Sequence, residues 1–540
     1  MVSAEIRKSK FVEWYSRYGT PAKMGLYFNA LEDPNAVLDY RATHPARPEF
    51  HQDVDRSLFP APGHSIYEIT ELSRLKLLFE NSNQVKTADD GSIKSGIGNY
   101  VMWLRLWDPE TWKDEPFWDG DCVAAGTPTG RTRMATLLKN GFDYLKELEY
   151  RKATYKMDRY LAAIRTKPFV LLAGISGTGK SRLVRQLARG FCPAERPLAD
   201  EKKPGNFEMI QVRPNWHDST ELLGYVSRVS GKPEYVVKDF VTFLVKAWMY
   251  PKVPFFLCLD EMNLAPVEQY FAEYLSVIET RQKDGDAIVT DPIVRFEDAV
   301  FEQAFRDLLE PYAEVPQFGT DDEKAALEAL TNQMKSSHAL SIPQNLVVIG
   351  TVNMDETTFS FSRKVLDRAM SFELNEVNMR DGLTASTKTP LGAFKHDGSP
   401  LQRYIEADEV YPSNKDLCDK VLGYLETVNE KLDKTPFKIA YRSRNEIMVY
   451  CVERTKDGAV SLEQALDEAT SMKILSRIEG DRRRLRVDNT RTLLDVLNET
   501  IESKLKELHG DNELPTHICR DKLEEMKSQL EGGYTSFWTR

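Results

Sequence analysis

The stretch LLAGISGTGKSRLVRQLA, residues 171–188, decides the fold that we expect for this chain. It begins as an apolar, β-prone segment, turns through several glycines, and continues with apolar residues at helical spacing. The turn matches the pattern GxxxxGK[ST] completely from Gly174 to Ser181. A strand, a loop of this pattern and a helix, in that order, predict a site for the phosphate groups of a nucleotide.

The spacing within this loop has a chemical reason. Glycines let the backbone curl so that its N–H groups point at phosphate oxygens, and the following helix presents its positive N-terminus to the same anion. We expect Lys180 to reach the β- and γ-phosphates and the hydroxyl of Ser181 to bind Mg²⁺. A chance turn is the alternative, but the bare pattern arises at random in roughly a few per cent of chains of this length. The candidate phosphate-binding residues are Gly174, Ser176, Gly177, Thr178, Gly179, Lys180 and Ser181.

An acidic pair supports this interpretation. The apolar segment VPFFLCLD, residues 253–260, ends in Asp260, and Glu261 follows directly. A carboxylate at a strand end can hold Mg²⁺ or its water shell, and the next one can polarise an attacking water. Alone, such a pair is usually a solvated strand end. After a complete phosphate loop, we assign metal binding to Asp260 and the role of base to Glu261.

A third apolar segment, NLVVIGTVN at residues 345–353, ends in Asn353. Its side chain could contact the γ-phosphate or orient the attacking water, and the alternative for an asparagine at a strand end is a turn residue. Beyond it lie Arg363 and Arg368, either of which could reach the nucleotide of a neighbouring subunit as an arginine finger. A surface ion pair is the other interpretation of each arginine.

Apolar strands that alternate with helical segments predict an α/β fold with a parallel sheet buried on both faces. After about residue 375 the chain lacks such strands and is predicted to be mostly helical. The first 150 residues are rich in aromatic residues. The tryptophans within residues 102–118 fit the core of a small domain, with a pocket for an unstacked base as the alternative. We therefore divide the chain into residues 1–150, 151–375 and 376–505 and a charged tail over 506–540.

Together these motifs resemble those of AAA+ NTPases. The similarity is greater to the McrB-type motors of modification-dependent restriction systems, in the branch that also includes MoxR and dynein. It rests on the order of the phosphate loop, LDEMN at 259–263, VIGTVNMDETT at 348–358 and KVLDRA at 364–369. Further similar stretches are residues 212–236, 441–450 and 472–485, so the resemblance covers roughly residues 165–490 and excludes residues 1–150.

The resemblance implies an AAA+ P-loop NTPase core, built on the parallel sheet, with a helical lid and a separate, mostly helical α+β N-terminal domain. By this resemblance Asn353 is the first sensor and Arg442 the second sensor, which contacts the nucleotide. Arg368 is the first choice for the trans-acting arginine and Arg363 the second. Members of the group assemble as rings, usually hexamers, with nucleotide at the subunit interfaces.

McrB-type members favour GTP and drive a separate McrC-type nuclease. The chain is thus expected to be the motor subunit of an anti-phage DNA restriction system, with Mg²⁺ and GTP or ATP as cofactors. DNA would be recognised by the N-terminal domain or the pore. The McrB signature reads roughly MNxxD[RK]S, whereas this chain has VNMDETT, with Glu356 in place of the acid and Thr357 in place of the basic residue. The choice between GTP and ATP therefore stays open, and a MoxR-like chaperone that remodels a protein partner is the alternative function.

Composition sets outer limits to these hypotheses. The chain has 540 residues and a net charge of −11, which argues against coating nucleic acid by bulk charge but allows a local basic patch. Four arginines between 482 and 486 form the densest basic cluster, and a lid surface or subunit contact is as good an interpretation as phosphate binding. Because no apolar run approaches the ~18 residues that a membrane span needs, we expect a cytoplasmic protein without a membrane partner.

Overall fold

The computed structural model divides the chain into two compact units, Met1–Lys152 and Ala153–Arg540. It describes residues 157–538 except 195–197, 201, 286, 314–320, 355–358, 360, 376–388, 395, 457, 459 and 511–513, and before these the positions 8, 11, 12, 31, 34, 64–69, 74, 75, 78, 97 and 100. The tryptophans of residues 102–118, together with Glu356 and Thr357, lie outside the described residues, so the predictions made for them stay predictions.

In the first unit, the described residues include a cluster of buried aromatic side chains. Tyr67, in the 3-10 turn η4 (Ile66–Glu68), and Tyr100 pack edge to face with their ring centroids 5.1 Å apart. Phe11 lies edge to face against the ring of Tyr100, with 5.3 Å between the centroids. All three side chains are almost fully buried, so these aromatic residues of the first unit serve packing.

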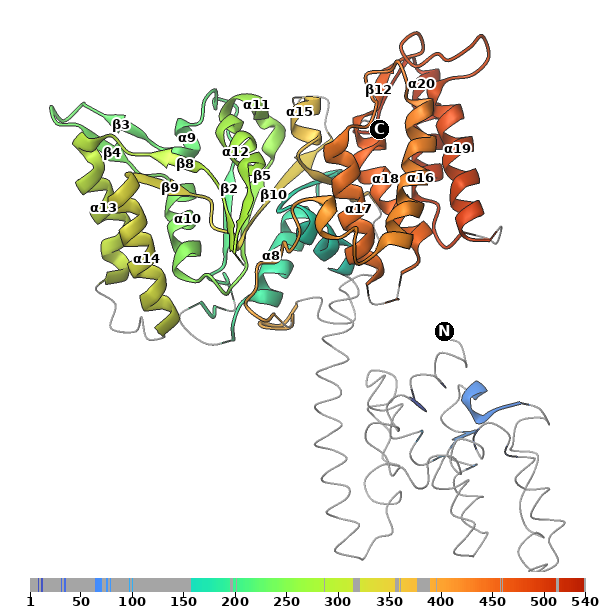
Figure 1. Ribbon diagram of the computed structural model, residues 1–540, viewed down its shortest axis with the longest axis horizontal. Coiled ribbons are helices and arrows are strands. Elements are labelled where there is room, and N and C mark those ends of the chain that lie inside the picture. The colour runs from blue at the N-terminus through green and yellow to red at the C-terminus, as the bar shows by residue number, and fades with distance from the viewer. Residues whose placement is uncertain are drawn as a thin grey trace, which may run out of the picture. The chain divides into compact units, whose positions relative to one another are not determined.

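A five-stranded parallel sheet forms the centre of the second unit (Figure 1). Its strand order is β11-β1-β10-β5-β2, and each neighbouring pair runs parallel. Parallel strands need crossover connections, which here contain the helices that cover the sheet. The prediction of an α/β fold with a parallel sheet is therefore confirmed. The strands are β1 (Phe169–Gly174), β2 (Phe207–Gln211), β5 (Phe255–Asp260), β10 (Leu346–Asn353) and β11 (Met370–Glu373).

Helices and strands of this layer share one apolar core. Phe169 and Leu257 from the strands lie in the same buried cluster as Phe240 and Leu244 from α10. Burying apolar faces on both sides of the sheet is what fixes the strand ends in place. The helical elements are α8 (Lys180–Phe191), α9 (Thr220–Leu223), α10 (Asp239–Met249), η6 (Met262–Leu264), α11 (Val267–Tyr270), α12 (Ala272–Val277), η7 (Ile278–Thr280) and α15 (Arg363–Leu366).

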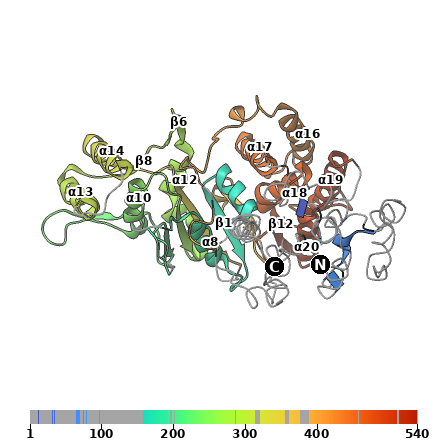
Figure 2. The same ribbon diagram turned by 90° about the horizontal axis from the view of Figure 1, so that it is seen from below.

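The long segment between the acidic pair and Asn353 forms short antiparallel strand pairs and two helices. Strands β8 (Pro292–Arg295) and β9 (Ala339–Ser341) pair antiparallel, and the two helices between them lie at the end of this unit opposite the C-terminal helices (Figures 1 and 2). Asp322 in the second of these helices forms an exposed ion pair with Lys252 at 2.7 Å, as expected for a charged surface helix. The remaining elements are α13 (Asp298–Ala313), α14 (Asp321–Ser337), β3 (Tyr225–Ser227), β4 (Glu234–Val236), β6 (Gln282–Asp284) and β7 (Ala287–Val289).

After β11 the described chain is mostly helical, and the charged segment over residues 506–540 contains a helix that packs in this layer. Asp467, buried in α18, accepts hydrogen bonds from the backbone N–H groups of Ile518 and Cys519, both at 2.9 Å, at the start of α20. Leu523 and Met526 of α20 are fully buried, which holds this helix against its neighbours. The elements are η8 (Ala407–Glu409), α16 (Lys415–Lys431), α17 (Tyr441–Thr455), α18 (Leu462–Lys473), η9 (Leu475–Arg477), β12 (Glu479–Asp481), α19 (Leu493–Leu508), α20 (Ile518–Glu531) and β13 (Tyr534–Ser536).

Throughout the described residues, no helix has both the length and the apolar character that crossing a bilayer would require.

Candidate active site

The carboxyl ends of β1, β5 and β10 bring the predicted polar residues to one edge of the sheet. In the strand register Gly174 lies opposite Asn353, and Gly350 lies opposite Leu259. The strands therefore end together, so the phosphate loop after β1, the acidic pair after β5 and Asn353 at the end of β10 meet there. Ligands of parallel α/β sheets bind at this edge.

The phosphate loop has the backbone that its glycines allow. Gly177 and Gly179 both have a φ of 86°, in the left-handed region, and no described atom lies within 4 Å of the position that a Cβ would take. Gly174 is closed in, because a Cβ there would lie 2.3 Å from the carbonyl oxygen of Leu374. The first glycine thus permits close packing, and the other two permit the curl of the loop.

Lys180, the first residue of α8, is buried inside this loop. Its ammonium group donates to the carbonyl oxygens of Gly174 at 2.9 Å and Ile175 at 2.8 Å. The hydroxyl of Thr178 donates to the Ile175 oxygen at 3.1 Å, and Ser176 is exposed. A nucleotide phosphate would offer the ammonium group a charged acceptor in place of these neutral carbonyl oxygens.

Asp260 lies between two hydroxyl groups. Ser181 Oγ donates to Asp260 Oδ1 at 2.6 Å, and Thr351 Oγ1 donates to the same oxygen at 2.7 Å. Mg²⁺ prefers oxygen ligands such as a hydroxyl and a carboxylate. Ser181 and Asp260, side by side at the phosphate loop, therefore fit the Mg²⁺ that was predicted here.

Glu261 has an unusual backbone and two polar partners. Its φ of 54° and ψ of 48° place it in the left-handed region, which a residue with a side chain rarely adopts. Its N–H donates to Thr351 Oγ1 at 3.0 Å, and its carboxylate oxygen Oε1 accepts from Asn353 Nδ2 at 2.9 Å. The structure thus brings the predicted base and the predicted first sensor into direct contact.

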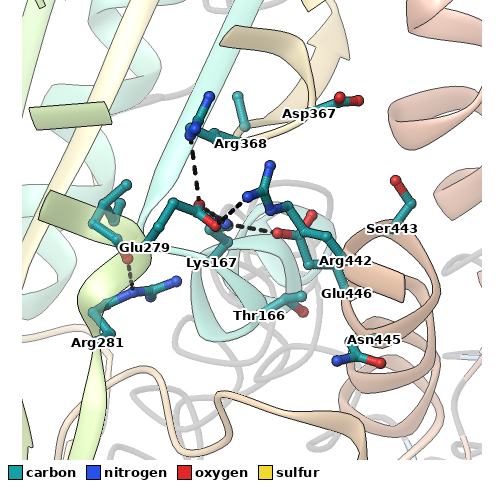
Figure 3. Close-up of polar contacts among 12 residues, drawn as sticks. Thr166, Lys167, Glu279, Arg281, Asp367, Arg368, Arg442, Ser443, Asn445 and Glu446 are labelled. Carbon is teal, nitrogen blue, oxygen red and sulfur yellow. Dashed lines mark hydrogen bonds and ion pairs between the residues drawn. The ribbon is translucent and has the colours of Figure 1, made fainter. Parts of the chain in front are cut away.

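Within the described residues, the three candidate arginines make their contacts away from the phosphate loop of their own chain. Arg363 donates to the carbonyl oxygen of Pro436 at 3.1 Å and lies over the ring of Phe437, 4.8 Å from its centroid. Arg368 and Arg442 instead point toward one carboxylate, that of Glu279 (Figure 3).

Glu279 lies at the amino end of the sheet. Its Oε2 is 2.8 Å from Arg442 Nη2, and its Oε1 is 2.8 Å from Lys167 Nζ and 3.9 Å from Arg368 Nε. Lys167 precedes β1, whereas Gly174 ends it, and a strand rises about 3.3 Å per residue, so about 20 Å of chain separates the two positions. Arg442, predicted to contact the nucleotide, is therefore placed with Arg368 at the opposite edge of the sheet from Lys180.

A second carboxylate, Glu446, joins the helical layer to this cluster. It is buried between Lys167 Nζ at 2.7 Å and Lys473 Nζ at 2.5 Å. Burial opposes its charge, but the two ammonium groups outweigh burial and lower the pKa of Glu446 to about 2. Burial likewise opposes the charge of Glu279, and Lys167 and Arg442 hold its pKa below the ordinary value. Both carboxylates are therefore ionised at neutral pH.

Thr351 at the phosphate loop is not among the predicted residues, and neither are Glu279, Glu446, Lys167 and Lys473 of the second cluster. A signal for Thr351 was present, because residues two apart in a strand share a face and Thr351 precedes Asn353 by two. Glu279 has no such signal, since its partners come from segments far apart in the chain.

A family model described as a domain of unknown function (DUF8727) matches residues 393–533. No curated protein matches the chain. The crystal structure of a protein from Cytophaga hutchinsonii, described as a candidate ATPase, is similar over 70% of this chain and 98% of its own, with 14% sequence identity and a TM-score of 0.36. Function is therefore inferred from the site itself.

Proposed function

We propose that the chain is a ring-forming AAA+ nucleoside triphosphatase, hydrolysing GTP or ATP, and the motor subunit of a McrBC-like DNA restriction system with a separate nuclease. The observation that supports hydrolysis is the meeting of the phosphate loop, Asp260, Glu261 and Asn353 at one edge of the sheet. A phosphate loop alone would suit a nucleotide-dependent switch, whereas a carboxylate held beside it suits a hydrolase.

The proposed chemistry follows from these positions. The N–H groups of the loop and Lys180 bind the β- and γ-phosphates, and Ser181 and Asp260 would hold Mg²⁺, which when bound neutralises phosphate charge. Glu261, held by Asn353, accepts a proton from the attacking water. As the water oxygen bonds to the γ-phosphorus, the bond from that phosphorus to the β–γ bridging oxygen breaks, and the diphosphate leaves with this oxygen.

The arginines are proposed to act on the nucleotide of a second copy. Arg368 and Arg442 share Glu279 at the amino end of the sheet, on the far side from the loop of their own chain. In a head-to-tail ring one face of each subunit meets a different face of the next. That arrangement could bring both guanidinium groups to the neighbouring phosphates, with Arg363 as the further candidate.

Hydrolysis of GTP and of ATP, measured with and without a candidate nuclease partner, tests the proposal. We expect Lys180→Ala to abolish turnover of the preferred nucleotide, because the charge that binds the β- and γ-phosphates is lost. Lys252→Ala removes only an exposed ion pair on the same unit and is the matched control. If wild type hydrolyses neither nucleotide under either condition, the proposed motor function is wrong.

The restriction role has its own test. If a nuclease gene adjoins the gene of this chain, both genes together should reduce phage plaque formation, and Lys180→Ala should remove the protection. Protection that persists in the Lys180→Ala strain would separate the restriction role from nucleotide hydrolysis. An adjacent gene for a protein with a von Willebrand-type metal site would favour the chaperone function instead.

A further inference from the structure

Thr351 is a buried hydroxyl residue between the two acidic side chains of the site. It lies in β10 directly after Gly350, which pairs with Leu259, so the next position along β5 is Asp260. Its side chain is almost completely buried, with 2% of its surface exposed. A buried hydroxyl needs hydrogen-bond partners, and Thr351 has one as a donor and one as an acceptor.

Its donated hydrogen bond orients the carboxylate of Asp260. Oδ1 of Asp260 accepts from both Ser181 at 2.6 Å and Thr351 at 2.7 Å. Within the described chain no residue donates to Oδ2 of Asp260. Two hydroxyl groups on one oxygen therefore leave the other oxygen for Mg²⁺ or a water bound to it.

Its accepted hydrogen bond supports the backbone of Glu261. The N–H of Glu261 donates to Thr351 Oγ1 at 3.0 Å, in a residue whose φ of 54° is disfavoured for any residue with a side chain. The same backbone position presents the Glu261 carboxylate to Asn353 at 2.9 Å. The hydrogen bond to Thr351 thus offsets part of the energetic cost of the backbone conformation that places the Glu261 carboxylate.

We propose that Thr351 is a positioning residue that fixes the metal carboxylate and the base relative to one another through one hydroxyl group. Threonine suits this role because branching at Cβ restricts its first side-chain torsion in a strand, so the direction of the hydroxyl is fixed. The inference rests on the proposed hydrolysis, in which Asp260 and Glu261 must act on the same nucleotide.

The test compares Thr351→Val, which keeps the shape without the hydroxyl, with Thr351→Ser, which keeps the hydroxyl. We expect Thr351→Val to lower kcat about 10- to 100-fold with little change in KM, as for loss of an outer partner of a metal ligand. In EDTA, Thr351→Val should bind a non-hydrolysable nucleotide with the same affinity as wild type. The increase in this affinity when Mg²⁺ is added should be smaller in Thr351→Val than in wild type. Thr351→Ser should restore most of each property.

A further readout needs no nucleotide. In hydrogen–deuterium exchange of the nucleotide-free protein, the peptide that contains Glu261 should exchange faster in Thr351→Val than in wild type. Ser371→Ala is the matched control, because Ser371 is a buried residue of the same sheet whose hydroxyl has no hydrogen-bond partner in the described chain. It should change none of these measurements.

The inference would be overturned if Thr351→Val had the same kcat, Mg²⁺ dependence and hydrogen–deuterium exchange as wild type. A Thr351→Ser variant as impaired as Thr351→Val would also overturn it, as would an equal loss of nucleotide affinity with and without Mg²⁺, which would indicate a merely structural role. If wild type itself hydrolyses no nucleotide, the proposed function fails, and the exchange experiment still decides whether the Thr351 bridge exists.

Discussion

Glu261 combines the strained backbone and the proposed chemistry in one residue. A left-handed conformation at a residue with a side chain costs on the order of 1–3 kcal/mol. The surrounding contacts hold it, because Thr351 accepts its N–H and Asn353 donates to its carboxylate. These contacts hold the carboxylate in one position beside the phosphate loop. A base held in this way is preorganised, because it needs no reorientation during the reaction.

Glu261→Gln separates the basicity of this residue from its geometry. Glutamine keeps a side-chain oxygen that can accept from Asn353, so we expect the fold and nucleotide affinity to be retained. Loss of the base should lower single-turnover hydrolysis about 10²- to 10⁴-fold and trap bound nucleotide. Glu273→Gln, at an exposed position of α12, is the control. Turnover equal to wild type in Glu261→Gln would rule out the assigned base.

Predictability from sequence differs between residues of this site. Lys180, Asp260 and Asn353 could be predicted because each follows or ends an apolar run, and parallel strands place their carboxyl ends together. The position of Arg442 could not be predicted, because it depends on how α17 packs against the sheet. That packing is set by contacts between segments far apart in the sequence, such as Lys167 with Glu446.

At the scale of elements, the long apolar runs were sufficient to predict β1, β5 and β10. The remaining two strands of the sheet carry weaker signals, since β11 spans only Met370–Glu373 and β2 is mostly half-buried. The charged segment after residue 505 suggested a tail, yet α20 keeps apolar residues at spacings of three and four between its charges. Those few positions, with Asp467 at its start, are enough to dock the helix.

The packing of α17 and α18 against the sheet depends on Glu446, which predicts a pH effect. Its pKa of about 2 lies below the ordinary value of 4.5, so its contribution is fully present above about pH 4.5 and is lost as the pH falls through 2. In Glu446→Gln, the ammonium groups of Lys167 and Lys473 stay buried but lose the negative charge that they share. We expect this variant to be less stable than wild type at pH 7 by about 3 kcal/mol.

Urea unfolding followed by circular dichroism at several pH values between 7 and 3 measures this difference. The difference in unfolding free energy between wild type and Glu446→Gln should narrow below about pH 4.5, because the carboxyl group of Glu446 is then protonated in the unfolded wild-type chain while it stays ionised in the folded one. Glu426→Gln, at an exposed position of α16, should follow wild type throughout. A difference that stays constant down to pH 3 would contradict the assigned charge of Glu446.

At the scale of the whole molecule, the proposed chemistry is split between the two ends of β1. The phosphate loop follows this strand, and Lys167, Glu279, Arg368 and Arg442 lie near its start, about 20 Å of chain away. An arginine side chain cannot span this distance, so Arg368 and Arg442 would not reach the phosphates bound by their own chain. A second copy, presenting its own Arg368, would supply a guanidinium group there.

Mixing two inactive variants tests this division of the site between copies. Arg368→Ala should abolish hydrolysis while sparing nucleotide binding, and Lys180→Ala should abolish binding of the phosphates. In a head-to-tail ring of equal parts of both variants, about one quarter of the interfaces would pair an intact Lys180 with an intact Arg368. Partial recovery of hydrolysis is therefore expected on mixing, and Arg403→Ala, which alters a half-exposed arginine that pairs with Asp397, should remain active alone. Mixed rings without recovery would show that Arg368 acts within its own subunit.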